Sequence, residues 1–124
     1  MIRTHIKIAA ASLFGLWLTS AATADEAAEK MVDEALPLMY HSCASVVEEA
    51  EGDNGYIEDV VRALLVVSLY NREIDISDYA KTEAEKTALH DRFVEALGKK
   101  CKADNNALLA GAIDGAVVDV ISRN

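Results

Sequence analysis

The sequence lacks the motifs on which most enzymes and nucleotide-binding proteins depend. It contains no glycine-rich phosphate loop, no nucleophile elbow and no zinc-binding spacing of cysteine and histidine. Basic residues are few, 12 against 21 acidic ones, and such an acidic surface argues against nucleic acid or an anionic membrane as a partner. We therefore expect that the protein is not an enzyme, and we assign it no catalytic residue, no metal ligand and no cofactor.

Long apolar runs are scarce as well. The longest, at 8–18, has 11 residues, whereas a membrane-spanning helix needs about 20. Three basic residues precede this run, and Ala22, Thr23 and Ala24 follow it, which is the layout of a secretory signal peptide. We expect cleavage between Ala24 and Asp25 and a periplasmic or secreted product without stable membrane anchoring. Retention of 1–24 as an N-terminal anchor is the alternative.

The chain left after cleavage, 25–124, is expected to be a single domain of 100 residues. It keeps ten basic and 21 acidic residues, a formal net charge of −11. The sole tryptophan, Trp17, is removed with the signal peptide. A helical domain of this size has a marginal core, so a covalent cross-link would contribute much of its stability.

Cysteine occurs only at Cys43 and Cys101. In an exported chain two cysteines are most simply a structural disulfide. Closing a loop of roughly 58 residues stabilises the folded state by about 4 kcal/mol on the chain-entropy model. The separation does not fit a redox C-x-x-C motif, and two thiols without clustered histidines do not make a zinc site.

Proline occurs once, and its position divides the first helical pattern. Apolar residues recur at helical spacing from 28 to 50, but Pro37 removes a backbone donor in the middle of that stretch. We expect a loosely held helix at 26–36 and a firmer one at 42–51. Ser42 or Ser45 can cap the second helix, and Ser45 and Glu48 have the spacing of a capping box.

The rest of the pattern predicts three more helical segments and one connector. The stretch 56–72 is apolar almost all round, which is typical of a central helix, and its length disfavours a strand. A polar connector at 71–82 leads to a helix at 83–101. The last helix is expected at 106–121, capped by Asp104 or Asn105. The fold class is therefore all-α: a small, disulfide-stapled domain of four or five helices.

A few residues invite a functional interpretation. Gly111 and Gly115 lie four apart beside the apolar stripe of the last helix, so they are candidates for a helix-packing or dimer contact. His41 and Cys43 could be imagined as two metal ligands, but a half-exposed histidine near a disulfide is the better interpretation. His90 and the acidic pairs at 48–49 and 58–59 are expected on solvated faces.

Around the two cysteines the chain resembles the small periplasmic proteins of the HdeA/HdeB-like group, most closely the YmgD-type members. The resemblance covers about 42–121. Its matching pieces are Cys43-Ala44, the run 70–76 (YNREIDI), Cys101-Lys102-Ala103-Asp104, Leu108-Leu109 and Ala112-Ile113-Asp114. The resemblance implies a compact all-α fold with one disulfide between these two cysteines. It also implies an acid-stress chaperone: a homodimer at neutral pH that exposes apolar surface to protein clients in acid.

The charge of the chain makes acid activation physically plausible. With every carboxylate protonated, the ten basic residues, two histidines and the amino terminus leave the 25–124 chain at about +13. This swing from −11 would loosen a marginal fold by self-repulsion. The alternative is a folded interaction protein of inhibitor or immunity type that binds one specific protein partner at neutral pH. A hydrolase would need His41 or His90 beside a nucleophile.

Overall fold

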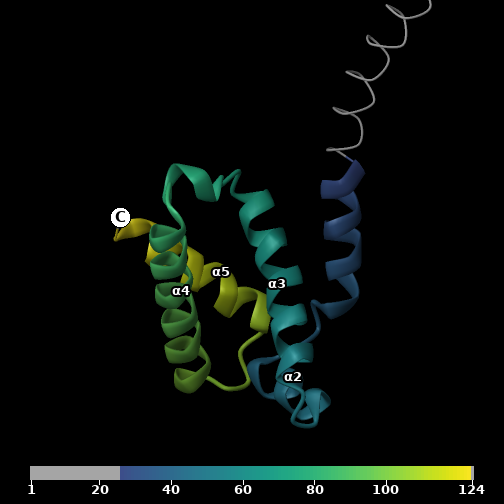
Figure 1. Cartoon of the computed structure of the whole chain (residues 1–124). Helices are drawn as coiled ribbons and strands as arrows, with labels where there is room; N and C mark the ends of the chain where they lie inside the picture. Colours follow the sequence, from purple (N-terminus) through teal and green to yellow (C-terminus); the bar gives the residue numbers. More distant parts are fainter. Residues whose placement is uncertain (1–25, 124) are drawn as a thin grey trace, which may run out of the picture. The chain divides into compact units, whose positions relative to one another are not determined.

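The computed structural model describes residues 26–123, of which 31–123 belong to one compact unit (Figure 1). The expected signal peptide and the cleavage site at Ala24 and Asp25 lie outside the described residues. The described part is all-helical, without a named strand. Residues 26–35 are helical, followed by η1 (Leu36–Leu38), α2 (Cys43–Ala50), α3 (Asn54–Asn71), η2 (Ile76–Asp78), α4 (Glu83–Ala103) and α5 (Leu109–Ser122). The expected all-α, disulfide-stapled domain is confirmed.

The start of α2 is fixed by a capping box, although not the expected one. Ser42 is the N-cap: the Ser45 amide donates to the Ser42 hydroxyl, and the Ser42 amide donates to the Ser45 hydroxyl. The predicted capping box of Ser45 with Glu48 was therefore wrong, because the actual box begins three residues earlier, at Ser42. The reason lies upstream, since Pro37 sits within η1 and ends the first helix, so α2 begins anew after an extended Ser42.

The turn after α2 uses left-handed backbone at Glu51 (φ 49°) and Gly52 (φ 89°), as the Gly-Asp-Asn-Gly sequence indicates. Asp53 then caps α3, accepting hydrogen bonds from the amides of Gly55 and Tyr56. The expectation of a central helix is met only in part. Val60, Leu64 and Ser68 are buried, and most of the other apolar side chains of α3 are partly buried against the core, but α5 is the helix that contacts both α3 and α4. Helix α3 forms one flank of the domain.

The predicted connector is present between α3 and α4, with η2 in its middle. Thr82 caps α4 by accepting a hydrogen bond from the Glu85 amide. This helix runs two residues past Cys101 to Ala103, and its apolar stripe is buried chiefly at Leu89 and Phe93. Lys100 and Lys102 lie in its last turn, where cations interact favourably with the helix dipole.

The last helix begins later than expected. Asp104 ends α4, and its carboxylate accepts from the Asn106 amide in the turn that follows, so neither Asp104 nor Asn105 caps α5. The N-cap position is Leu108, whose side chain makes no capping hydrogen bond. The first amide of α5 finds a backbone partner instead: Leu108 forms an isolated β-bridge with Ser42, and the Leu109 amide donates to the His41 carbonyl.

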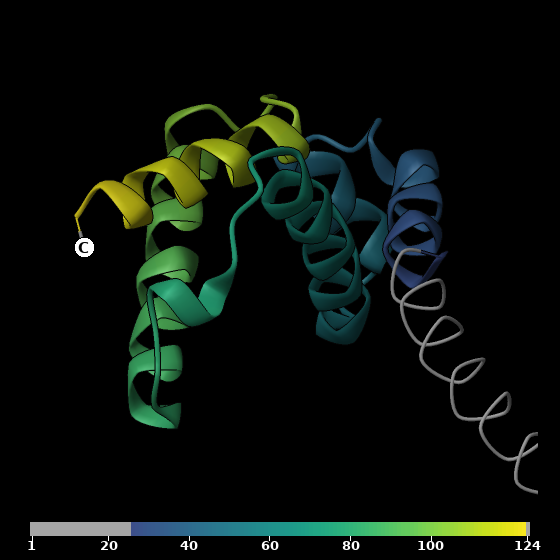
Figure 2. The ribbon, with the colours of Figure 1, turned by 90° about the horizontal axis from the view of Figure 1, so that it is seen from above.

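The core is built around α5, which packs against both α3 and α4 (Figures 1 and 2). Its apolar stripe is buried at 109, 112, 113, 116, 117 and 120, as the spacing predicts, and Ile113 and Ala116 are fully enclosed. The expected first and last members of the stripe differ: Leu108 is 59% exposed and Ile121 is partly buried. Figure 2 shows α3 and α4 on either side, with the connector between them. In contrast, α2 packs against α3. Two regions around this core differ in character.

Candidate functional site

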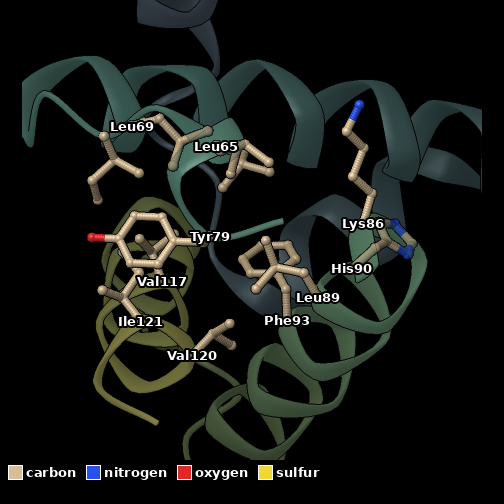
Figure 3. Close-up of a pocket in the computed structure, with 12 residues that line it drawn as sticks. Leu65, Leu69, Tyr79, Lys86, Leu89, His90, Phe93, Val117, Val120 and Ile121 are labelled. Atoms are coloured by element: carbon tan, nitrogen blue, oxygen red, sulfur yellow. The ribbon is translucent and has the colours of Figure 1, made fainter. Parts of the chain in front are cut away.

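The first region is an apolar hollow of about 200 Å³, which we call the apolar groove (Figure 3). It lies where α3, the connector, α4 and α5 meet. Nine of its twelve lining residues are fully apolar and three have polar ends. They are Leu65, Leu69, Ile74, Ile76, Tyr79, Lys86, Leu89, His90, Phe93, Val117, Val120 and Ile121.

The groove stays open because its walls come from short or flanking elements. Leu65 and Leu69, one turn apart on α3, are only half-buried, and Ile76 in η2 is 37% exposed. Its floor is firm: Phe93 of α4 and Val117 of α5 both belong to the buried core. The result is an apolar recess with a buried base and a partly exposed wall, the usual setting for binding an apolar group.

Three polar side chains border the groove. Lys86 and His90 are one turn apart on α4 and lie at one end, whereas Tyr79 lies toward the other (Figure 3). The Lys86 ammonium pairs with Glu83 at 3.3 Å, and His90 Nδ1 lies 3.8 Å from an Asp91 carboxylate oxygen. His90 is exposed, as expected, but the sequence did not indicate that it stands beside an apolar groove.

The second region, which we call the stapled end, contains the Cys43–Cys101 disulfide and the junction of segment 38–45 with the loop 104–109. The disulfide joins α2 to α4 with a Cα–Cα distance of 5.6 Å, which confirms the expected pairing. The amides of Cys43 and Ala44 donate to the carbonyls of Ala107 and Asn105. Covalent and backbone bonds therefore hold the two segments together.

His41 lies at the centre of the stapled end and is completely buried, so the expectation of a half-exposed histidine was wrong. Its Nδ1 is 2.9 Å from the Ser45 hydroxyl. Its Nε2 is 3.1 Å from the Tyr56 hydroxyl and 3.3 Å from a Glu49 carboxylate oxygen. The Tyr40 ring stacks on the imidazole at 4.3 Å between centroids. The histidine thus connects the chain before α2 to both α2 and α3.

Glu49 receives the polar ends of this cluster, so it is more than a solvated carboxylate. The hydrogen bonds from Tyr40 and then Tyr56 hold its pKa below the ordinary value. Reciprocally, the bond to Glu49 raises the pKa of Tyr40 to about 12. Burial, followed by the bond to Glu49, raises the pKa of Tyr56. Removing the Glu49 charge would therefore weaken contacts on three segments together.

Ser45, His41 and Glu49 resemble a serine hydrolase triad in composition and distance. The surroundings do not match that chemistry. The Ser45 hydroxyl is engaged in the capping box, and the first amides of α2, which would form an oxyanion site, already donate to Ala107 and Asn105. The cluster instead connects neighbouring segments through hydrogen bonds between its polar groups. Within residues 26–123, no buried side-chain nitrogen or oxygen lacks a hydrogen-bond partner.

Two carboxylates of α5 tie it to its neighbours. Asp114 accepts two hydrogen bonds from the Arg72 guanidinium, both at 2.7 Å, and a third from the buried Ser68 hydroxyl. The hydrogen bonds from Arg72 and then Ser68 lower the pKa of Asp114 to about 2. Asp119 pairs with Lys100 of α4 at 3.1 Å. Glu49 likewise joins α2 to α3, through the Tyr56 hydroxyl.

The two candidate glycines have different surroundings. A methyl group on Gly115 would lie 2.9 Å from the Lys100 side chain, so the lysine stem crosses α5 at that residue. At Gly111, an added methyl group would meet nothing within 4 Å among the described parts of the chain. Within the domain, Gly115 therefore accommodates a side chain of α4 and not a helix backbone. A role of either glycine in a dimer stays a prediction.

The described residues contain no group of three or more acidic, cysteine or histidine side chains placed to hold a metal ion. Across 26–123, no helix combines the length and apolarity that crossing a membrane requires. No protein-family model, curated protein or solved structure matches the chain.

Proposed function

We propose that this is an exported, non-catalytic protein that binds apolar segments of other proteins, and that acid increases this binding. The supporting observation is the apolar groove, which has a buried floor and a half-exposed wall. The groove is an accessible apolar surface of the kind that marks interaction sites. In this proposal the periplasmic HdeA-like chaperone role that the sequence suggests is carried by the groove.

Acid would act through the contacts that hold the helices around the groove. Asp114, Asp119 and Glu49 each join one helix to another, and all three are carboxylates. The pKa of Asp114 is lowered on folding, so its contribution to stability is complete above the unfolded value near 4. That contribution is lost as the pH falls through about 2. Acid thus removes the stabilisation that the Asp114 carboxylate contributes, while the disulfide persists.

The charge change acts in the same direction. The net charge of 25–124 moves from −11 to about +13 in acid, and the resulting repulsion would spread the helices. Because the disulfide joins α2 to α4 directly, the stapled end would remain connected. We therefore expect the wall formed by α3 and the connector to separate first, enlarging the apolar surface presented to a client.

The test is suppression of aggregation of a model client by the oxidised 25–124 chain at about pH 2.5 and at pH 7. Two matched variants locate the surface. Ile76 lines the groove and Val118 does not, yet they are 37% and 38% exposed, so Ile76→Gln and Val118→Gln remove similar apolar area. We expect protection chiefly in acid, reduced several-fold by Ile76→Gln and little changed by Val118→Gln. Equal protection by both variants would exclude the groove.

A second candidate is a folded interaction protein of inhibitor or immunity type that binds one partner at neutral pH. One observation favours it: the groove is already open in the folded chain, so binding would require no loosening. A pull-down from a periplasmic extract at pH 7, with wild type, Ile76→Gln and Val118→Gln compared, separates the two candidates. A partner lost only with Ile76→Gln, together with no client protection in acid, would favour the second.

A further inference from the structure

The polar border of the apolar groove indicates which segments it would prefer. The only charged or titratable groups among its lining residues are Tyr79, Lys86 and His90. No carboxylate lines it, although the chain carries 21 acidic residues. Lys86 and His90 place two nitrogen donors at one end of an otherwise apolar recess (Figure 3). A bound group that ends in a carboxylate complements such a border, whereas a cationic group does not.

The acidic neighbours of these two side chains leave them available. Glu83 pairs with Lys86 at 3.3 Å, but its side chain is 92% exposed. Asp91 lies 3.8 Å from His90, and both of these side chains are more than 70% exposed. Exposed pairs of this kind are weak and exchange readily with water, so an incoming carboxylate can replace either partner. At physiological ionic strength the remote acidic residues are largely screened beyond about 8 Å.

The size of the groove limits the apolar part of the occupant. An enclosed cavity of about 150 Å³ accommodates a benzene molecule, and this groove measures about 200 Å³. It therefore suits one large aliphatic or aromatic side chain. Because the groove is open on one side, the backbone that carries this side chain can pass across its mouth, and a neighbouring residue can reach Lys86.

We propose that the groove selects protein segments in which one large apolar side chain is flanked, within one helical turn, by an acidic residue. The apolar side chain fills the recess between α3, α4 and α5, and the carboxylate pairs with Lys86 and accepts a hydrogen bond from the His90 ring. This inference rests on the proposed function only in using the same groove as the binding site, and it concerns neutral pH, where the carboxylate of the segment is ionised.

The experiment is calorimetric titration at pH 7 of the oxidised 25–124 chain with two capped seven-residue peptides. Both carry a central phenylalanine in an alanine background, and they differ only by glutamate or glutamine three residues from it. We expect the glutamate peptide to bind about threefold more tightly, the range of an exposed charge pair. Lys86→Gln should abolish this difference. The matched control Lys99→Gln should preserve it, since Lys99 is also an exposed α4 lysine, paired with Glu95, and lies outside the groove.

The outcomes separate this inference from the proposed function. Equal affinity for the two peptides, or binding of neither, overturns the acidic preference. If Ile76→Gln still lowers client protection more than Val118→Gln does, the proposed function survives that loss. Conversely, a glutamate preference that depends on Lys86, with client protection insensitive to Ile76, supports the inference and overturns the proposed function. Neither lysine variant should disturb folding, because the Lys86 and Lys99 side chains are 48% and 70% exposed and each pairs only with an exposed carboxylate of its own helix.

Discussion

The stapled end and the apolar groove lie in one small domain but are held together in different ways. At the stapled end, a disulfide, a β-bridge between Ser42 and Leu108 and a fully buried histidine connect segments that are distant in the sequence. At the groove, half-exposed aliphatic side chains meet around a recess of about 200 Å³. The first region fixes the geometry of the chain, and the second leaves apolar surface accessible.

The difference shows how a small domain can be stable and still expose an apolar surface. A core of this size gives a small free energy of unfolding. Apolar surface can therefore stay exposed only if other contacts stabilise the fold. Helix α2, which begins at Cys43, lies at the opposite end of the domain from the connector that walls the groove (Figure 1). Three perturbations test this division, and we order them by expected effect on the free energy of unfolding.

The largest effect should come from removing the disulfide. The double change Cys43→Ser and Cys101→Ser should lower the free energy of unfolding by about 4 kcal/mol, because the cross-link spans 58 residues. Urea unfolding at pH 7 measures this loss. We expect acid to unfold the double variant completely, whereas the oxidised wild type keeps helical structure. A loss below about 1 kcal/mol would show that the backbone bonds of the stapled end suffice without the cross-link.

Replacing His41 should have the next largest effect. His41→Ala leaves a cavity and removes a partner from Ser45 and Tyr56, so we expect a loss of about 3 kcal/mol. The matched control is His90→Ala, which removes an exposed ring at the groove and should change stability by less than about 0.5 kcal/mol. Thermal unfolding of the two variants measures the contrast. Similar melting temperatures for both would contradict the division between the two regions.

Asp114→Asn should have the smallest effect on stability and the clearest effect on its pH dependence. Because the Asp114 side chain is 42% exposed, we expect a loss of only about 1 kcal/mol at pH 7. Its folded pKa is about 2, so wild type should lose this increment as the pH falls from about 4 to 2. The variant should lack that part of the slope, as measured by urea unfolding across the interval. The control Asp59→Asn, at a 78% exposed side chain, should keep it.

Much of the fold could be predicted because strong local signals determine it. The stripe of α5 has an uninterrupted helical spacing, Thr82 provides the N-cap of α4, and the two cysteines could pair only with each other. The cap of α5 could not be predicted. Asp104 has the side chain of an N-cap, but it ends α4 and accepts a hydrogen bond within the following loop, and the Leu109 amide at the start of α5 donates to the distant His41 carbonyl.

The candidate site was harder to predict, because it depends on contacts between segments far apart in the sequence. His41 and Tyr56 are 15 residues apart, and Arg72 and Asp114 are 42 apart. The spacing of residues along the sequence does not indicate which distant residues will pair. The excess of apolar residues in 56–72 did carry a signal: it exceeded what a core of this size can bury, and the surplus at Leu65 and Leu69 forms the groove wall.

Amide hydrogen exchange tests the difference between the two regions most directly. At the stapled end, the amides of Cys43, Ala44 and Leu109 donate across the junction, whereas the Ile74 and Ala80 amides hold the connector that walls the groove. At about pH 4, we predict that the first group exchanges only through global unfolding and the second through local openings, at least tenfold faster after correction for intrinsic rates. Equal protection of both groups would contradict a firm stapled end beside a loosely held groove.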